Sequence, residues 1–222
     1  MPKVTEEYLE SKRQMIVDAC YQVCLRKPVE MVTISDVIAE TGMSQGAIYR
    51  YYSGLDDILA DMSSKMRTDY NIIKSFEVIL SDKEATLEEL TYRVCDSLAE
   101  TMESHLMDIQ KINFDFGVLA INEPDRAAKI MADISEPGNL EYLGRNALPR
   151  LIKGAYTLGY KPIASPEDIG LFISASYTGI EKLCIMSACY GTGDPDIKAE
   201  PKKLFRTLAD SVILLLGGKI NG

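Results

Sequence analysis

The sequence predicts an all-α protein, with a small N-terminal three-helix module followed by a larger C-terminal helical domain. Strand signals are nearly absent from the 222 residues, whereas apolar side chains recur at helical spacing along most of the chain. Proline and glycine interrupt that spacing at intervals typical of helix lengths. Hydrophobic residues make up 46% of the chain, which is enough for a sizeable core. We place the N-terminal module at residues 1–54 and the C-terminal domain at residues 55–222.

The first helix is expected over residues 5–27. One of its faces carries Ile16, Ala19, Cys20 and Val23, and Pro28 ends it because proline cannot continue a helix. Two shorter helices follow within residues 33–52, joined by a tight turn. This arrangement is a helix-turn-helix.

The chemistry of each position in residues 33–52 supports that interpretation. Thr33 is a good N-cap, and Asp36 stands three residues later, where an acid favours a helix N-terminus. Gly42 supplies the backbone freedom that a sharp turn requires. Ser44 can cap the second helix, and Ile48 can anchor that helix in a small core.

The second helix has the composition of a helix that lies in the DNA major groove. Its outer face carries small residues that allow close approach, and polar, aromatic and basic residues that can reach base edges or phosphates. The candidate DNA-binding residues are Thr33, Ser44, Gln45, Gly46, Ala47, Tyr49, Arg50 and Tyr51.

This stretch resembles the N-terminal signature of the tetracycline-repressor (TetR) family of transcriptional regulators. The resemblance rests on the ungapped pattern Thr33-Ile34-x-Asp36-Val37-x-Ala39-x-x-Gly42-Met43-Ser44-x-Gly46-x-Ile48-Tyr49-x-Tyr51-Tyr52. It covers about a tenth of the chain, and beyond it only the layout is similar. The resemblance implies a homodimer that binds a palindromic DNA operator, most often as a repressor, and is released by a small molecule. One position departs from the pattern: Leu55 stands where the family usually has a phosphate-contacting lysine.

The C-terminal domain is expected to contain a series of further helices. A Thr86-x-x-Glu89 capping box opens one of them, and prolines or glycines mark the boundaries of most others. The expected ranges are 55–80, 86–104, 106–121, 124–134, a helix after Pro137-Gly138 that bends at Pro149 and ends at Gly159, 166–190, and 201–216.

The last two helices have the composition of a subunit interface. The first mixes apolar with small side chains, and the second is apolar almost all round. In the family that this chain resembles, these helices form the dimer through a four-helix bundle. The candidate interface residues are Phe172, Ile173, Ser176, Ile180, Leu204, Leu208, Val212 and Leu215. The pattern alone leaves intrachain core packing open as the alternative.

A small-molecule pocket in the C-terminal body is implied by the resemblance, and helix bundles build such pockets from inward side chains. The candidate lining residues are Tyr92, Asn113, Phe114, Phe116, Tyr142, Tyr156, Tyr177 and Glu181. Glu181 or Asp115 inside the pocket would favour a cationic ligand, whereas the abundance of Met and Tyr would suit an adaptable apolar one.

Charge and cysteine content bear on DNA binding and on the location of the protein in the cell. The net charge is -9, and residues 1–52 carry six basic and seven acidic side chains, so charge alone does not indicate a DNA-binding protein. The five cysteines are scattered, as is typical of reduced proteins of the cytosol. The sequence shows no apolar leader and no uncharged apolar run of about 18 residues, so we expect a soluble cytoplasmic protein.

Signs of catalysis are weak. His105 is the only histidine and has no nucleophile motif near it, and Cys20 and Cys24 alone cannot complete a metal site. We therefore expect no enzyme activity, cofactor or metal. The main alternative function is a helical protein-binding adaptor that has lost DNA binding, which the non-basic module and Leu55 keep open.

Overall fold

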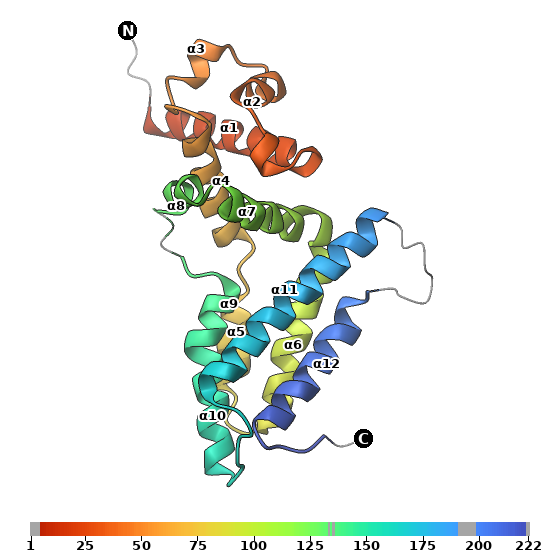
Figure 1. Cartoon of the computed structure of the whole chain (residues 1–222). Coiled ribbons are helices and arrows are strands. Elements are labelled where there is room, and N and C mark those ends of the chain that lie inside the picture. The colour runs from red at the N-terminus through yellow and green to blue at the C-terminus, as the bar shows by residue number, and fades with distance from the viewer. Residues whose placement is uncertain (1–4, 133, 135, 191–198, 221–222) are drawn as a thin grey trace. The chain divides into compact units, whose positions relative to one another are not determined.

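The computed structural model describes residues 5–132, 134, 136–190 and 199–220. Helices account for nearly all the regular structure of these residues, and no strand occurs among them (Figure 1). The predicted all-α fold is therefore confirmed.

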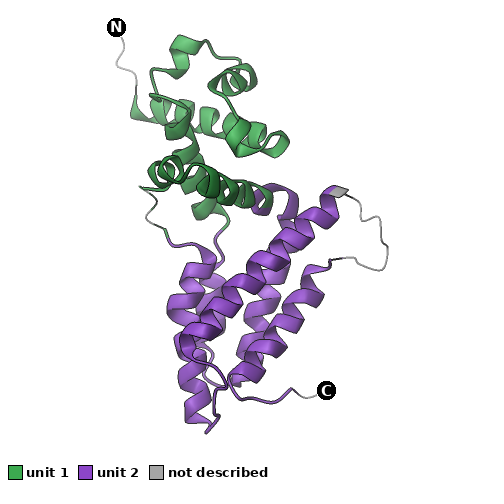
Figure 2. Ribbon diagram, viewed as in Figure 1, with its two compact units in different colours: residues 1–70, 111–136 green, residues 71–110, 137–222 purple. Residues whose placement is uncertain are grey.

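The chain divides into two compact units, which Figure 2 shows in different colours. Unit 1 comprises Met1–Tyr70 and Lys111–Glu136, and unit 2 comprises Asn71–Gln110 and Pro137–Gly222. The expected boundary at residue 54 concerns which residues contact DNA, and it stays a prediction. Packing divides the chain elsewhere, because three helices beyond residue 54 share the core of the N-terminal helices.

Unit 1 begins with α1 (Glu6–Arg26), a short 3-10 turn (Val29–Met31), α2 (Ile34–Thr41) and α3 (Gln45–Ile48). It continues with α4 (Leu55–Asp69), and α7 (Lys111–Asn122) and α8 (Pro124–Met131) complete it. Ile16 and Cys20 on the predicted face of α1 are fully buried, as are Ile58 and Leu59 of α4. An ion pair of 2.8 Å between Arg126 of α8 and Asp56 joins α8 to the start of α4.

The single helix predicted over residues 55–80 is wrong, because α4 ends at Asp69 and α5 (Ile73–Ser81) starts separately. Between them, the backbone N–H of Ile72 donates to Oδ1 of Asn139 at 3.1 Å instead of continuing the helical ladder. Neither proline nor glycine marks this break. It depends on a residue 67 positions away, so local sequence reasoning could not find it.

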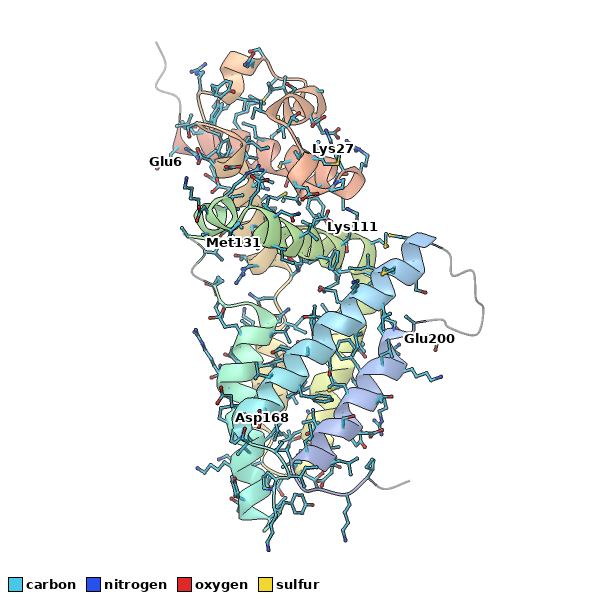
Figure 3. The ribbon with its side chains drawn as sticks, viewed as in Figure 1. Glu6, Lys27, Lys111, Met131, Asp168 and Glu200 are labelled. Carbon is cyan, nitrogen blue, oxygen red and sulfur yellow. The ribbon has the colours of Figure 1, made fainter. Side chains whose placement is uncertain are left out.

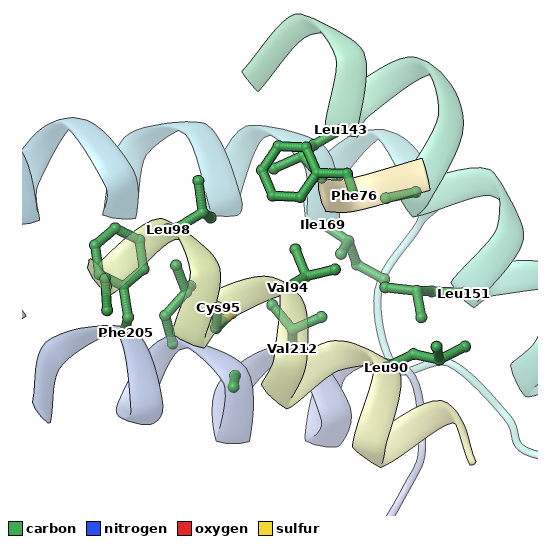
Figure 4. Close-up of a cluster of buried hydrophobic side chains, with 14 of the residues drawn as sticks. Phe76, Leu90, Val94, Cys95, Leu98, Leu143, Leu151, Ile169, Phe205 and Val212 are labelled. Carbon is green, nitrogen blue, oxygen red and sulfur yellow. The ribbon is translucent and has the colours of Figure 1, made fainter. Parts of the chain in front are cut away.

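Unit 2 is a bundle around α6 (Leu87–Ser104), which begins with the predicted Thr86–Glu89 capping box. The helix α12 (Pro201–Leu215) packs along α6, and α11 (Pro166–Tyr190) packs on both α12 and the α10 (Leu148–Thr157) region. Figure 4 shows the core of this unit, where Val94, Cys95 and Leu98 of α6 lie among side chains from the other helices.

Two segments of unit 2 are π-helical: Leu106–Gln110 before α7, and Leu143–Ala147 between α9 (Asn139–Tyr142) and α10. The second lies directly before Pro149, where a bend was predicted. A proline ring clashes with the carbonyl of the residue four positions earlier, and the wider π turn relieves that clash. The backbone N–H of Leu148 accordingly bonds to the carbonyl of Leu143, five residues back.

The predicted glycine ends of helices are confirmed at Gly159 (φ 76°) and Gly217 (φ 83°). A Cβ atom at Gly217 would lie 2.5 Å from the carbonyl oxygen of Lys161, so only glycine fits this close approach.

Among the described helices, α11 is long and apolar enough to cross a membrane by length and composition alone. Its window Pro166–Cys189 has a mean hydropathy of 1.3, and 22% of that window is buried. One such helix is weak support for a membrane protein, because a helix that pairs with another subunit has the same composition.

Candidate nucleic-acid interface

The first helix of the motif, α2, starts with a reciprocal cap. The Thr33 side chain accepts from the backbone N–H of Asp36 at 3.3 Å, and the Asp36 carboxylate accepts from the backbone N–H of Thr33 at 2.8 Å. Lys27, labelled in Figure 3, donates to the same carboxylate at 2.7 Å. The hydrogen bond from Lys27, followed by those from Thr33, lowers the pKa of Asp36 to about 2.

The turn between α2 and α3 is built from local hydrogen bonds. Gly42 adopts φ 66°, and its N–H donates to the carbonyl of Ile38 at 3.1 Å. The hydroxyl of Ser44 then accepts from the backbone N–H of Ala47 at 3.3 Å, which caps α3. These contacts confirm the predicted helix-turn-helix and set the angle between its helices.

Two residues fix the rotation of α3 against the rest of unit 1. Ile48 is fully buried, and Tyr52 is only 4% exposed. The Tyr52 hydroxyl donates to Asp61 of α4 at 2.7 Å, and the Arg13 guanidinium of α1 lies 5.2 Å from the centre of the Tyr52 ring. Burial and then the Asp61 hydrogen bond raise the pKa of Tyr52.

Tyr52 was not among the predicted site residues. It contributes by holding the others in place, and its position as the second member of the Tyr51-Tyr52 pair was the available signal.

With Ile48 and Tyr52 inward, most candidate DNA-binding side chains face solvent. Tyr49 is 46% exposed. A Cβ atom added at Gly46 would meet nothing within 4 Å, so this side of α3 is open. The exposed candidates are Thr33, Ser44, Gln45, Gly46, Tyr49 and Arg50, while Ala47 and Tyr51 are half-buried. We call this exposed set, with Ala47 and Tyr51, the α3 surface.

Most cations near the α3 surface are already paired with acids. Arg26 bonds to Glu40, Lys27 to Asp36 at 2.7 Å, and Arg13 approaches Asp61 at 3.9 Å. Arg50 is exposed, and no ion pair engages it within the described part of the chain. Arg50 is therefore the cation best placed for a phosphate.

The start of α4 supplies no compensating positive charge. Leu55 is half-buried, and the first turn of α4 carries Asp56 and Asp57. Ser53 donates to the Asp57 carboxylate through both its backbone N–H and its hydroxyl. Arg126 partly neutralises this end through its ion pair with Asp56 at 2.8 Å.

The structure disperses the eight residues predicted to line a ligand pocket. Asn113, Phe114 and Phe116 lie on α7, in unit 1. Tyr156 is 59% exposed on α10. Tyr156 and the other four belong to unit 2, where Tyr177 and Glu181 lie one turn apart on α11.

Those four residues make individual contacts within unit 2. The Tyr92 hydroxyl donates to Asp210 at 2.6 Å, and the Tyr142 ring lies 6.3 Å from that of Phe76. The Tyr177 hydroxyl donates to Gln110 at 3.3 Å. Burial raises the pKa of Glu181, one turn beyond Tyr177, to about 7.

Unit 2 also contains an apolar cavity of about 70 Å³, lined by α6, the α9–α10 region, α11 and α12. Its walls include Val94, Leu143, Ala147, Leu151 and Val212, and none of the eight predicted residues lines it. Figure 4 shows Val94, Leu143, Leu151 and Val212 converging from three helical regions. Sequence reasoning favoured aromatic and polar residues, whereas this cavity is lined by aliphatic ones.

The predicted interface residues fall into two groups. Ile180, Leu208 and Val212 are buried inside unit 2, where they belong to its hydrophobic core. Phe172 is 40% exposed, and Ile173, Ser176, Leu204 and Leu215 are half-buried.

The outer face of α11 also exposes apolar residues that were not predicted. Leu183 is 53% exposed and Met186 is 45% exposed. With Phe172, Ala175 and Gly179, they recur every three or four residues, which places them on one side of the helix. We call these five residues the α11 stripe.

Comparison with known proteins places the motif in a family. Residues 16–62 match the sequence model of "Bacterial regulatory proteins, tetR family". The uncharacterized HTH-type transcriptional regulator YfiR of Bacillus subtilis (strain 168) is 37% identical over 57 residues. That match spans 26% of this chain and 28% of the length of YfiR.

Solved structures share the fold over most of the chain. A TetR-family transcriptional regulator from Mesorhizobium loti MAFF303099 has a TM-score of 0.62 at 13% identity, over 93% of this chain and 97% of that one. The multidrug binding protein EbrR complexed with ethidium has a TM-score of 0.57 at 17% identity, over 88% of this chain and 95% of that one. Residues 16–62 are therefore similar to the bacterial regulatory proteins of the tetR family, and the fold of the chain is similar to that of the solved TetR-family structures.

Proposed function

We propose that this protein is a ligand-responsive transcriptional repressor that binds a palindromic operator as a homodimer and acts in the cytoplasm. The observation that carries the proposal is the α3 surface, which is capped, anchored from behind and exposed in front. A helix presented in this way can enter a major groove with few steric obstacles.

The α3 surface offers two kinds of contact to DNA. Gln45 and Tyr49 are exposed and can meet base edges or the backbone, whereas Arg50 can meet a phosphate. Contacts to bases discriminate between sequences, and contacts to phosphates do not. The two kinds are therefore separable by experiment.

Gel shifts with the chain's own upstream DNA test this assignment. Gln45→Ala and Tyr49→Ala should weaken operator binding while leaving the oligomeric state unchanged. Arg50→Ala should weaken binding to all sequences alike and lower the salt slope by about one unit. Lys74→Ala removes an exposed cation from α5 in unit 2 and is the matched control. Wild-type binding by both Gln45→Ala and Tyr49→Ala would show that α3 does not read DNA.

The alternative of a protein-binding adaptor makes the opposite prediction. This alternative predicts no sequence-selective DNA binding at any salt concentration, because few unpaired cations lie around α3. A stable complex with another protein would then favour the adaptor.

The α11 stripe supports self-association. It combines exposed apolar side chains with small residues that allow close approach of a partner helix, and a palindrome requires two reading helices about 34 Å apart. The predicted contacts of Phe172, Ile173, Ser176, Leu204 and Leu215 belong to the same proposal.

Sedimentation of a variant with a charge on the stripe tests the dimer. Leu183→Arg should yield monomers that bind operator DNA more weakly, because a charge cannot be buried without a partner. Ile163→Arg is the matched control, since Ile163 is 74% exposed in unit 2 but lies outside the stripe. A dimer unaffected by Leu183→Arg would place the interface elsewhere.

Release by a ligand requires that binding in unit 2 alters α4. The chain crosses between the two units at Tyr70–Asn71, at Gln110–Lys111 and at Glu136–Pro137, so these three junctions are the covalent routes for such coupling. A coupling of about 1–3 kcal/mol changes operator affinity by 5-fold to 150-fold. Gel shifts with and without ligand measure it directly.

A further inference from the structure

We infer that the effector of this regulator is a small, uncharged, apolar molecule that binds in the cavity of unit 2. This inference rests on the proposed ligand response and specifies the chemical class of the ligand. It is carried by the apolar lining of the cavity, by its volume, and by the absence of charged residues from its described lining.

The lining offers a ligand almost no polar partner. No Asp, Glu, Lys, Arg or His is among the residues that line the cavity in the described part of unit 2. The buried hydroxyl of Thr91 already donates to the carbonyl of Leu87 at 2.8 Å. Burial raises the pKa of the Cys95 thiol to about 12, so it is neutral at physiological pH. An ion that entered would lose its hydration without gaining a counter-charge.

Small residues create the space. Gly144 and Ala147 belong to the π-helical segment, and Gly170 lies opposite on α11, where an added Cβ would come within 3.3 Å of the Leu148 side chain. π-helical segments are rare and occur frequently at functional sites. Here the segment forms one wall of the cavity.

The cavity reaches the surface beside Gly144 and Ser174, which are both exposed and both part of its lining. An apolar cavity of about 150 Å³ in another protein stays dry and takes benzene. A volume of about 70 Å³ holds only part of such a ring, so the rest of the ligand would occupy this opening. The site therefore favours a compact molecule over a large flat one.

This chemistry differs from that expected for a binder of organic cations. Ethidium, found in the EbrR complex, is a large aromatic cation. Glu181, the acidic residue suggested by the sequence, does not line the cavity. No group in the lining would compensate a positive charge.

An isosteric pair of probes tests the ligand class on the full-length chain. Ethylbenzene and benzylammonium have nearly the same shape, but only benzylammonium is charged at pH 7. We expect saturable ethylbenzene binding by calorimetry, with benzylammonium at least tenfold weaker. Equal affinities, or tighter binding of the cation, would overturn the inference.

Two variants locate the binding site. Ala147→Val adds two methyl groups to the cavity wall and should weaken ethylbenzene binding at least tenfold. Gly144→Phe places a ring at the opening, where an added Cβ meets nothing within 4 Å, so it should fold even if the core variant does not. Gly117→Phe is the control, because Gly117 is an exposed helical glycine in unit 1 with equally free space. Wild-type affinity in Gly144→Phe and in folded Ala147→Val would place the ligand elsewhere.

Probe binding is measured without DNA, so the proposed ligand class and the proposed DNA-binding function can fail separately. Operator binding without ethylbenzene binding would overturn the ligand class and leave the DNA-binding proposal intact. Ethylbenzene binding without operator binding would support the cavity site and overturn the proposed regulator.

Discussion

The helix-turn-helix of unit 1 and the bundle of unit 2 are held together over very different distances along the chain. In the motif, the hydrogen bonds that set the geometry join residues three to nine positions apart, as in Thr33–Asp36, Ser44–Ala47 and Tyr52–Asp61. In unit 2, α6 packs along α12, and the Tyr92–Asp210 hydrogen bond spans 118 positions. A surface built locally can be recognised in a sequence, whereas a cavity built from distant helices cannot.

The largest effect is expected from a core truncation in unit 2. Phe205 is fully buried and meets the Tyr177 ring at 5.8 Å. Phe205→Ala should lower the free energy of unfolding by about 3–5 kcal/mol, through lost burial and the remaining cavity. Urea denaturation measures this change. Ile163→Ala, at a 74% exposed position, should change it by less than about 0.5 kcal/mol. Similar losses for both variants would contradict the packing of unit 2.

A pair of glycine variants separates stability from DNA contact in unit 1. Gly42→Ala should cost about 1–2 kcal/mol of stability, because φ of 66° strains any residue with a Cβ atom. Gly46→Ala should keep or slightly raise the stability, since alanine favours a helix. It should nevertheless weaken operator binding, because its methyl group stands on the α3 surface.

Thermal melts and gel shifts on the same two proteins test this contrast. A loss of stability in Gly46→Ala but not in Gly42→Ala would contradict the assignment of Gly42 to the turn and of Gly46 to the open side of α3.

Leu55→Lys sharpens the comparison by adding the charge that the family pattern leads one to expect. A lysine at the start of α4 should tighten binding to all DNA sequences and raise the salt slope by about one unit. Titrations of operator and non-operator DNA at several salt concentrations measure both quantities. An unchanged slope would mean that this position lies away from the phosphates.

Glu181→Gln should reveal the half-buried Glu181 carboxyl of unit 2 as a dependence of stability on pH. Burial raises the pKa of Glu181 to about 7, so the folded state binds its proton more tightly than the unfolded state. The wild type should lose stability as the pH rises from about 4.5 to 7, whereas Glu181→Gln should lose less. Melting temperatures at pH 4 and pH 8 test this. An equal loss in both proteins would show that Glu181 is solvated.

Asp36→Asn should change the stability least, and its pH dependence should have the opposite sign to that of Glu181→Gln. The pKa of Asp36 is lowered to about 2, so its contribution is complete above about pH 4 and is lost as the pH falls towards 2. The variant should be less stable than wild type at pH 6, and the difference should shrink at pH 2. A constant difference would indicate that the cap does not depend on the charge.

The helices themselves were largely predictable, because their boundaries carry local signals. Thr33, Ser44 and Thr86 cap helices as expected, and Pro166 and Pro201 open them. The break between α4 and α5 was missed because it depends on Asn139. The π-helical wall of the cavity was expected only as a bend at Pro149.

The candidate sites follow the same division. The α3 surface was predictable because periodicity and caps determine which side of a short helix faces inward. The lining of the unit 2 cavity was not predictable, since it is aliphatic, whereas the candidate aromatic side chains Phe116 and Tyr177 became core or local contacts. Helical spacing identified α11 and α12 as apolar. It could not tell which apolar residues are buried, such as Leu208 and Val212, which face α6, and which are exposed, such as the α11 stripe.

By itself, the sequence determined the all-α class, the helix-turn-helix and the orientation of the α3 surface, because caps, glycine turns and apolar spacing act between neighbouring residues. Only the tertiary structure decided where α4 ends, which apolar residues of α11 and α12 remain exposed, and where unit 2 is hollow. Those features depend on which helices, far apart in the sequence, pack against one another. The apolar spacing of a single helix does not specify its packing partners.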